Sequence, residues 1–537
     1  MHIQRKTLLF LALPLVLAVA AAYAQWILLG LPAVPVPQPP EAGPSGFPAW
    51  LRITHYVNLL FLVLLVRSGL QVLMDHPRLY WNVHCTPGTE WLRLTPIEVP
   101  QDRVWTSKDD SRYLSPWLGL PGLRHTIGMA RHWHFLSVLF WVGNGLLFVA
   151  LLFATDQWQR LAPNSWQIIP DAWAVWVHYA TLHLPPEPNG FYQYNALQQL
   201  TYFGVVFILA PLAILTGPSM SPALTNRFQW YPKLPGNRQI GRSLHFLVMS
   251  AFVLFVIGHV AMVAITGFVQ NMNHIVVGTD DTSLTGIYLG LVGLGVIVVV
   301  NVLAHRLAWR QPRFVQHVAK AIVTPVMWLL LNRSVPVAEF PDKDISPFFW
   351  ANGKLPTCEE WKTLADNDFQ RYRLKVYGLV ENPVELSLDD LRALGKQTQT
   401  TLHHCIQGWS GIAEWGGLPL PALIKLVRPQ PTAQRVVFHS FGDGVEFSTG
   451  ESNGRYYDSL PMANAMQPQS LLAYEMNGET LPHLNGAPLR LRVENQLGFK
   501  MVKWIQSIEF VAELQDVGEG EGGYAEDYEY FGELANI

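Results

Sequence analysis

Six apolar runs, each long enough to cross a lipid bilayer, occupy much of the first part of this 537-residue chain. A helix needs about 20 mainly apolar residues to span the hydrocarbon core of a membrane. The runs cover residues 7–31, 49–74, 131–155, 197–216, 241–269 and 284–304. We therefore expect an all-α transmembrane helical bundle in this part of the chain.

The remainder of the chain has a different character. Charged residues make up 14% of the sequence and its mean hydropathy is +0.17, which is too apolar for an ordinary soluble protein and too polar for one that lies wholly in a membrane. From about Phe340 onward charged residues return, and residues 371–378 and 503–511 alternate as strands do. The fold class is therefore multi-domain, with a soluble mixed α/β domain after the bundle.

Local signals and changes of composition divide the chain further. Asn477-Gly478 predicts a hairpin turn, and Ser387 with Asp390 predicts a capping box that opens a short helix through Leu394. The tail is acidic and Gly-rich, so we expect a solvated arm that wraps the soluble domain. The expected segments are an anchor or signal-like helix at 1–31, the main bundle at 49–305, a linker or interfacial helix at 306–339, the soluble domain at 340–515 and the tail at 516–537.

The first apolar run has two interpretations. It follows Arg5 and Lys6 and contains Ala22-Tyr23-Ala24, a pattern also found at the cleavage site of a signal peptide. Its apolar stretch continues beyond that point through Trp26 to Leu31, which favours a membrane anchor.

Loop charges predict the orientation of the bundle, because Lys and Arg are enriched in cytoplasmic loops. The loops after the second, fourth and sixth runs carry most of these residues: Arg78, Arg93, Arg103, Lys108, Arg112 and Arg124; Arg227, Lys233 and Arg238; Arg306, Arg310 and Arg313. The alternate loops carry Arg160 alone or only acids. We expect the first set to be cytoplasmic, and the Trp-rich stretch 166–183 to form an interfacial helix on the outer side.

Composition also excludes some functions. The net charge of -3, without a Lys/Arg-rich block, argues against nucleic acid as a partner. Three cysteines cannot build a disulfide framework or a four-thiolate metal site within one chain. Any cysteine with a special role must therefore act alone.

Four histidines within the apolar runs are candidate metal ligands, because ionisable side chains are costly in a membrane. His245 and His259 are 14 residues apart on one run, which places them on nearly the same helix face about 21 Å apart. The predicted orientation places His259 near the outer face with His55, and His245 near the inner face with His134. Two haems, each held by one pair, would use all four. The alternative is a set of polar residues satisfied within the bundle, and His132 is a rival for His134.

A resemblance supports the haem interpretation. Arg131-His132-Trp133-His134-Phe135, ending at Asn144-Gly145, together with His245-Phe246 and His259, resembles the di-haem cytochrome b subunits of thiosulfate reductase and formate dehydrogenase over residues 49–305. The resemblance implies two haem b groups that exchange electrons with the quinone pool. No separate quinone-site motif is visible.

A single cysteine marks the soluble domain. His403-His404-Cys405-Ile406-Gln407-Gly408 follows a strand-like run. A lone cysteine is often a small buried apolar residue, but a soft thiolate also suits molybdenum as its one protein ligand. Residues 485–490 and 498–503 combine glycines, Arg490 and two lysines, a composition that suits a phosphate.

These motifs resemble the sulfite oxidase fold of molybdopterin enzymes, in particular the periplasmic methionine sulfoxide reductase catalytic subunits, over residues 340–515. The resemblance implies Mo-molybdopterin as cofactor and Cys405 as the catalytic molybdenum thiolate. Phe348-Phe349-Trp350-Ala351-Asn352 resembles the first motif of that fold. The implied cofactor-binding residues are Asn352, Asn485, Arg490, Met501, Val502 and Lys503, with Ser440 as a weaker candidate.

The sequence departs from true sulfite oxidases at informative positions. Ile406 and Gln407 replace an asparagine-arginine stretch after the cysteine, and Ala351 replaces an arginine. Because arginine is the natural clamp for a sulfite-like dianion, its absence disfavours sulfite. Three other arginines could substitute: Arg428, Arg435 and Arg455. We expect Cys85 and Cys358 to be bystanders, and we leave open whether His404 binds the cofactor or only packs.

Together the two halves predict a membrane-bound molybdenum oxidoreductase that exchanges electrons between quinone and a small oxo-transfer substrate. The expected direction is reduction of a sulfoxide-like substrate. One alternative is a sulfite-type oxidase that reduces quinone, and another is a membrane electron carrier whose soluble domain has lost its cofactor.

The predicted location is a bacterial-type inner membrane, crossed several times. Residues 314–331 are apolar but contain His317 and Lys320. If this segment lies along the membrane surface the molybdopterin domain is cytoplasmic, and if it crosses, the domain is periplasmic. We favour the cytoplasm, because Arg5-Lys6 is not a convincing twin-arginine export signal.

Overall fold

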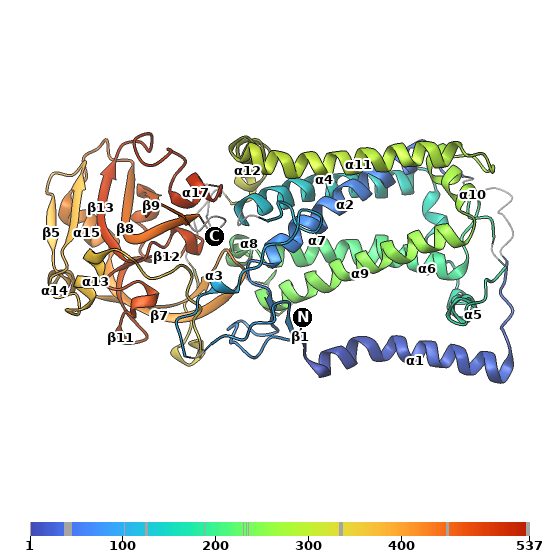
Figure 1. Cartoon of the computed structure of the whole chain (residues 1–537), viewed down its shortest axis with the longest axis horizontal. Coiled ribbons are helices and arrows are strands. Elements are labelled where there is room, and N and C mark those ends of the chain that lie inside the picture. The colour runs from blue at the N-terminus through green and yellow to red at the C-terminus, as the bar shows by residue number, and fades with distance from the viewer. Residues whose placement is uncertain are drawn as a thin grey trace.

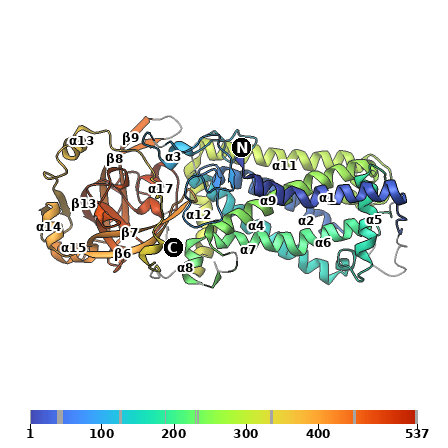
Figure 2. The ribbon, with the colours of Figure 1, turned by 90° about the horizontal axis from the view of Figure 1, so that it is seen from below.

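The computed structural model describes residues 2–36, 46–100, 102–123, 127–186, 188–228, 230–231, 234, 236–331, 337–446 and 451–532. Arg124, Lys233 and the last five residues of the predicted tail lie outside this description. The described chain forms a helical part and a sheet-rich part, joined end to end (Figures 1 and 2).

In the described ranges, six helices are long and apolar enough to cross a membrane, as expected from the sequence. They are α1 (Arg5–Leu29), α2 (Ala49–Leu73), α4 (Ile127–Ala154), the continuous helix α6 (Ala196–Gly204), π-helical Val205–Leu209 and α7 (Ala210–Ser219), then α9 (Arg238–Ile265) and α11 (Thr285–Arg310). Many large apolar side chains of these helices are exposed on the surface of the protein, as a lipid environment requires. α1 stands apart from the others and packs against α5 (Ile168–Ala180), the Trp-rich segment, which lies across the far end of the bundle (Figure 1).

The sheet-rich part contains two five-stranded sheets. One has the order β11-β10-β7-β6 with β12 paired to β10, and the other has the order β5-β4-β13-β8-β9. The strands are β4 (Leu374–Gly378), β5 (Val384–Leu386), β6 (Gln397–His404), β7 (Ser410–Pro419), β8 (Arg435–Glu446), β9 (Glu451–Pro461), β10 (Ser470–Met476), β11 (Glu479–Thr480), β12 (Arg490–Val493) and β13 (Ile505–Val511). Buried side chains of both sheets form one apolar core, which α13 (Glu359–Ala365), α14 (Leu388–Ala393) and α15 (Leu420–Val427) help to cover.

Local sequence signals hold in this domain. Asn477 and Gly478 have φ angles of 54° and 77° and connect β10 to β11, so the hairpin prediction is confirmed. Ser387 accepts a hydrogen bond from the Asp390 backbone, and the Asp390 side chain accepts one from the Ser387 backbone, so the capping box is also confirmed. The predicted strands 371–378 and 503–511 correspond to β4 and β13. The first begins three residues later than predicted and the second two residues later.

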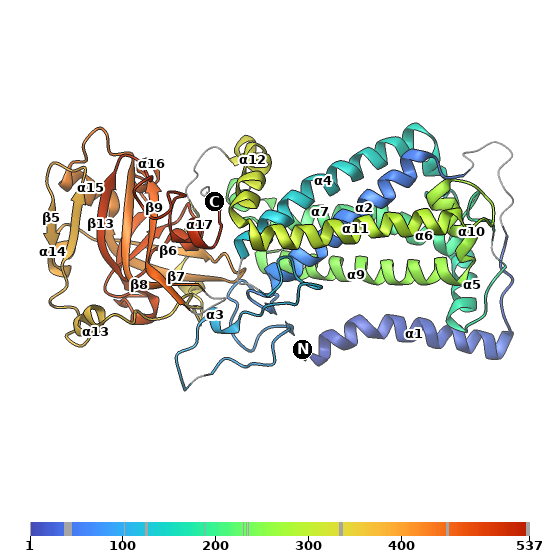
Figure 3. The same cartoon turned by 45° about the horizontal axis from the view of Figure 1, so that its top comes forward.

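Helix α12 (Pro312–Leu331) corresponds to the segment whose path the sequence left open. It lies across the end of the bundle, between the bundle and the sheet-rich domain (Figures 1 and 3). It packs on α4 and α11 and is not one of the six candidate spans of the described chain. Its position matches the alternative in which this segment lies along the surface. The sheet-rich domain is therefore at the end of the bundle that carries the Arg-rich loops.

The acidic tail is a solvated arm only in its first part: residues 516–521 are exposed or half-buried, whereas the expectation is wrong for residues 522–527, which are buried. Residues 524–527 of the short helix α17 (Tyr524–Tyr528) are buried. An ion pair fixes the tail to the sheet-rich domain. Lys500 pairs with Asp458 of β9 at 2.7 Å and with Glu526 of the tail. On α12, Arg313 donates to the Asp527 carbonyl at 2.7 Å. The tail thus ties the sheet-rich domain to α12.

Acidification should loosen this tail. Glu521 accepts hydrogen bonds from His317 at 2.7 Å and Lys320 at 2.9 Å. Partial burial acts to raise the pKa of Glu521, but these cationic partners outweigh it and leave the pKa below its ordinary value. A carboxyl whose folded pKa is lowered contributes stability above its unfolded pKa, about 4.3, and this contribution is lost as pH falls through the folded pKa. We expect the protection factors for amide hydrogen exchange in residues 519–531 to fall only below about pH 4.3, and equal protection factors at pH 3 and pH 6 would contradict this.

Candidate active site at the domain junction

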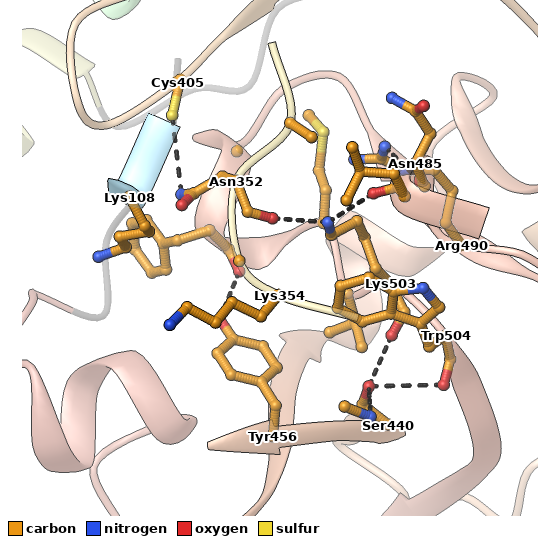
Figure 4. A pocket seen from close by; sticks show the side chains of 18 of the residues that line it. Lys108, Asn352, Lys354, Cys405, Ser440, Tyr456, Asn485, Arg490, Lys503 and Trp504 are labelled. Atoms are coloured by element: carbon orange, nitrogen blue, oxygen red, sulfur yellow. Dashed lines mark hydrogen bonds between the residues drawn. The ribbon is translucent and has the colours of Figure 1, made fainter. Parts of the chain in front are cut away.

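A cavity of about 190 Å³ lies in the sheet-rich domain next to the junction with the bundle. All eight residues that the sequence assigned to the soluble site line it: Asn352, Cys405, Ser440, Asn485, Arg490, Met501, Val502 and Lys503. They come from segments far apart in the sequence and surround one space (Figure 4). The fold therefore brings together the residues that the motifs singled out.

Cys405 follows the last residue of β6, in the tight turn that leads to β7. The turn is closed by hydrogen bonds between the backbones of Cys405 and Trp409 at 3.2 Å and of Gly408 and Cys405 at 3.2 Å. Gly408 has a φ angle of 111°, which glycine adopts without strain. The Cys405 Sγ atom lies 3.9 Å from Asn352 Nδ2 and 3.8 Å from Gln407 Oε1.

The environment of Cys405 does not activate its thiol by itself. Burial raises the pKa of Cys405 to about 12, so at neutral pH it is protonated and unreactive. A coordinated metal ion would deprotonate it outright. Among the described residues, no three His, Cys, Asp or Glu side chains gather to hold a metal ion.

Two buried cations form another part of the cavity wall. Lys503 donates from Nζ to the carbonyls of Asn352 at 2.5 Å and Leu484 at 2.9 Å, and Arg490 donates to the Asn485 carbonyl at 2.8 Å. Burial, and then the charge of Arg490, lower the pKa of Lys503 far below its ordinary value, and burial and Arg492 do the same for Arg490.

Burying such charges is costly unless an anion neutralises them. Within the described chain, Arg490 Nε and Asn352 Oδ1 also have no hydrogen-bond partner. The residues present thus fit a cofactor with an anionic, phosphate-bearing part. Ser440 has a supporting position, because its hydroxyl donates to the Lys503 carbonyl at 2.6 Å.

The histidine that lines the cavity is His403, to which no sequence motif pointed. The Arg492 guanidinium donates a hydrogen bond to His403 Nδ1 at 3.1 Å, whereas His404 is not among the lining residues. Side chains alternate along a strand, so His403 and Cys405 share a face and His404 points away from it. This period of two was a signal in the sequence that could have identified His403. The three candidate substitute arginines, Arg428, Arg435 and Arg455, do not line the cavity either.

The loop between α2 and α4 packs against the Cys405 turn and forms hydrogen bonds with it. This loop includes β2 (Arg78–Leu79), which pairs with β3 (Leu92–Arg93), and α3 (Ser107–Asp110). Gln407 donates to the Asp75 carbonyl and to the Ser111 hydroxyl, both at 3.3 Å. The Ser107 backbone donates to the Ala351 carbonyl at 2.9 Å. Cys85 is part of the same contact, because its sulfur accepts a hydrogen bond from the Ser410 backbone at 3.4 Å.

Helix α9 reaches the same turn from the bundle. Arg238 donates to the Trp409 carbonyl at 3.1 Å, and Gln239 donates to the Gly408 carbonyl at 2.9 Å. The turn that carries Cys405 is therefore in direct contact with a helix that also carries His245 and His259.

Replacing Arg78 with methionine should detach the loop between α2 and α4 from the Cys405 turn. Arg78 forms fully buried ion pairs with Asp110 at 2.7 Å and Glu90 at 2.8 Å. Its loss leaves the buried Asp110 without this ion pair and Glu90 with only the longer, 3.9 Å pair to Arg93, and breaking a buried pair typically costs about 3–5 kcal/mol. We expect rapid proteolysis within residues 75–112 of the purified R78M protein. The control is R103M in the same loop, whose exposed side chain lies over the Trp105 ring and whose loss should change stability by about 0.5 kcal/mol or less. Equal resistance of both variants would refute the expectation.

In the bundle, the four histidines form two pairs, as the predicted orientation requires. The ring centres of His55 and His259 are 6.3 Å apart, and those of His134 and His245 are 6.4 Å apart. Metal to imidazole nitrogen bonds are about 2 Å long, so two rings on opposite sides of one metal ion have centres roughly 6 Å apart. Both separations therefore fit an iron between the rings.

Hydroxyl groups orient three of these rings. Each hydroxyl lies close to a ring Nδ1 atom: Ser68 at 3.2 Å from His134, Thr216 at 2.9 Å from His245 and Tyr202 at 3.2 Å from His259. Such contacts fix the orientation of metal-binding histidines and leave Nε2 for the metal. The rival His132 instead contacts the Tyr530 carbonyl at 2.8 Å through Nε2, on the opposite face of α4. The hydroxyl partners had no signal in the sequence.

Comparisons with known proteins identify both halves. The family model described as prokaryotic cytochrome b561 matches residues 46–276, and the one described as oxidoreductase molybdopterin binding domain matches residues 362–517. A chain described as protein-methionine-sulfoxide reductase subunit YedZ1 of Azospira oryzae is 37% identical over 167 residues, which are 31% of this chain and 57% of that protein. The protein-methionine-sulfoxide reductase catalytic subunit MsrP of Gluconobacter oxydans is 38% identical over 143 residues, 26% of this chain and 46% of that protein.

A solved structure, the sulfane dehydrogenase SoxCD from Paracoccus pantotrophus, covers 27% of this chain and 39% of its own at 27% identity and a TM-score of 0.23. The chain spans about half the length of the curated relatives it matches. The two family matches confirm the predicted multi-domain fold class and the fusion of a membrane cytochrome with a molybdopterin domain.

Proposed function

We propose that this fusion of a cytochrome b561 domain with a molybdopterin-binding oxidoreductase domain carries electrons from quinol through two b-type haems to a molybdenum centre that reduces a small sulfoxide-like substrate. His55 with His259, and His134 with His245, are the proposed haem ligands. Cys405 is the proposed molybdenum ligand. Asn352, Asn485, Arg490, Met501, Val502 and Lys503 hold the pterin cofactor and its phosphate, with Ser440 behind them.

The observation that carries this proposal is the contact between the Cys405 turn and α9. Arg238 of α9 donates to the carbonyl of Trp409 in this turn. His245 lies seven residues further along the same helix, about 10 Å along its axis. The proposed inner haem is therefore adjacent to the proposed molybdenum site, and electrons need no separate protein carrier between them.

The reaction balances with quinol as the reductant. A sulfoxide takes up two electrons and two protons and becomes a sulfide and water, while quinol releases two electrons and two protons and becomes quinone. The molybdenum cofactor, when bound, supplies two-electron oxygen-atom transfer. The chain contributes a thiolate ligand, a cationic pocket for the cofactor and a row of histidines that holds the haems in line across the membrane.

The buried cations favour a working enzyme over a carrier with an empty soluble domain. Lys503 and Arg490 face a cavity and make their hydrogen bonds to backbone carbonyls, an arrangement that a bound anion stabilises. The names of the two relatives, and the position of all three candidate substitute arginines outside the cavity, favour a sulfoxide over sulfite.

The proposed side of the membrane is the cytoplasm. The molybdopterin domain packs against the loops that carry most of the arginines and lysines of the bundle, and such loops face the cytoplasm. The first strand, β1 (His2–Ile3), pairs with β3 in one of these loops, so the N-terminus lies at the same end. A C-terminal reporter that is active only in the periplasm would contradict this placement.

The function is tested by following haem in the purified protein. The haems are first reduced with a quinol analogue, and methionine sulfoxide is then added without oxygen. Reoxidation of b-type haem supports the proposed reductase. Reduction of oxidised haem by sulfite would instead identify a sulfite-type oxidase, and a protein with haem but without molybdenum would be a carrier.

A further inference from the structure

A lysine of the membrane domain lines the cavity of the molybdopterin domain. Lys108 belongs to α3, in the loop between α2 and α4, and lies beside Asn352 and Cys405 in the wall of the cavity (Figure 4). Its side chain is only 7% exposed. The exposed Lys354 lines the same cavity but belongs to the molybdopterin domain itself.

The position of Lys108 is fixed by its surroundings. The Thr106 hydroxyl and backbone both bond to Asp109, which caps the first turn of α3. Asp110 is held by the buried Arg78. The Ser107 backbone and hydroxyl both donate to the Ala351 carbonyl, at 2.9 and 3.0 Å. Because α3 docks on the residue before Asn352, the lysine is part of a rigid wall.

The charge balance of the cavity indicates what this lysine can bind. Glu529 of the tail lies 3.8 Å from the Lys108 ammonium and also lines the cavity, so the two charges largely cancel. The deeper cations, Arg490 and Lys503, face the proposed cofactor. The exposed Lys354 is balanced by Asp443, which also lines the cavity, so a substrate dianion meets little net positive charge. A neutral molecule with one strongly negative oxygen can still accept a hydrogen bond from the ammonium.

The rest of the wall suits the apolar part of such a molecule. Trp350, Phe499, Tyr456 and Trp504 line the cavity around Lys108 and the cofactor-binding residues. A sulfoxide or N-oxide combines one polar oxygen with apolar substituents, which matches one ammonium donor within aromatic walls.

We propose that Lys108 is a substrate-binding residue, contributed by the membrane domain, whose ammonium donates a hydrogen bond to the oxygen of a neutral sulfoxide or N-oxide. The inference rests on the proposed reductase function and names the group that recognises the oxygen of its substrate. The active site is then complete only when the α2–α4 loop is docked.

The test uses the full-length holoenzyme with Lys108→Gln, Lys108→Arg, Glu529→Gln and Lys354→Gln. Dimethyl sulfoxide is the probe. Its dissociation constant is measured by ligand-observed NMR on the oxidised protein, which has no electrons with which to reduce it. KM and kcat are measured separately with a reduced viologen as donor. Haem spectrum and molybdenum content establish that each variant is folded and loaded.

Loss of a hydrogen bond from a charged donor should weaken binding roughly 10- to 100-fold in K108Q, with KM rising by the same factor. K108R, which keeps a cationic donor, should stay within a few-fold of the native protein. E529Q should bind the probe more tightly, because it removes a carboxylate that competes with the probe for the ammonium. If Lys108 served only to anchor the tail, E529Q would reproduce the weakened binding of K108Q, and this would overturn the proposal.

Three further outcomes also decide the matter. A KM rise in K354Q equal to that in K108Q would indicate diffuse attraction and would exclude a specific contact by Lys108. A native protein whose haems are not reoxidised by any sulfoxide refutes the proposed function itself. Reoxidation in the native protein with unchanged binding in K108Q refutes only the role of Lys108. If K108Q does not load its cofactors, the other two variants still decide. Binding close to native in K108R with tighter binding in E529Q supports the proposal, and weaker binding in both refutes it.

Discussion

Replacing Cys405 with serine is expected to lower sulfoxide reduction by about a thousandfold or more, the scale seen when a central catalytic group is removed. The Cys405 thiol is buried, and burial raises its pKa to about 12, so it is inert unless a metal ion binds it. Serine has nearly the same shape but is a hard and much weaker ligand for a soft, thiolate-preferring metal site. The measurement is the rate of reoxidation of reduced haem by methionine sulfoxide.

The haem spectrum of C405S should remain that of the native protein, because the histidine pairs lie within the bundle. The matched control is Cys358→Ser, which changes a half-buried thiol at the beginning of α13 whose sulfur lies 3.6 Å from the Phe441 carbonyl. C358S should retain its activity within a few-fold. A C405S protein with normal turnover, or a C358S protein as inactive as C405S, would show that Cys405 is not the metal ligand.

The residues of the cofactor site could be predicted from sequence because short motifs carry them. Cys405, the stretch around Arg490 and the stretch around Lys503 each combine unusual residue types within a few positions. All of them line one cavity. Their hydrogen-bond partners are largely backbone carbonyls, such as those of Asn352 and Leu484, and no sequence pattern reveals which carbonyl will face a lysine.

Lys108 and Glu529 could not be predicted, because they reach the cavity through the docking of separate parts of the chain. Lys108 was counted only as a charge in a cytoplasmic loop, and Glu529 only as part of an acidic tail. The error about the tail has the same origin. Acidic composition predicts solvation when no cation is near, but Lys500 and Arg313 approach from distant segments and compensate the buried carboxylates and carbonyls. Such long-range pairings are absent from local patterns.

The pairing of the histidines, in contrast, followed from topology alone. The direction of each helix sets the depth of each histidine, and residues at equal depth on adjacent helices can meet. The structure brings together the two expected pairs. The sequence did not reveal the hydroxyls of Ser68, Thr216 and Tyr202, because helix rotation and neighbour choice depend on packing among all the spans.

Replacing His134 with alanine is expected to remove one of two haems and to stop quinol-driven turnover. His134 and His245 face each other with ring centres 6.4 Å apart at the end of the bundle next to the Cys405 turn. Without one ligand the inner haem is lost, so haem b content should fall from about two to about one per chain. Electrons from quinol then have no route to the molybdopterin domain. Reduction of methionine sulfoxide by quinol should become undetectable, while reduction by a viologen that reaches the soluble domain directly should persist.

His132→Ala is the matched control, because it removes an imidazole from the same helix two residues away. His132 contacts the Tyr530 carbonyl at 2.8 Å, and loss of this hydrogen bond costs only about 1 kcal/mol. H132A should keep both haems and its quinol-driven activity. If H134A kept its full haem content while H132A lost half, the ligand assignment on α4 would be reversed. If both kept it, neither histidine would be needed to hold a haem, and the assignment of His134 to the inner pair would fail.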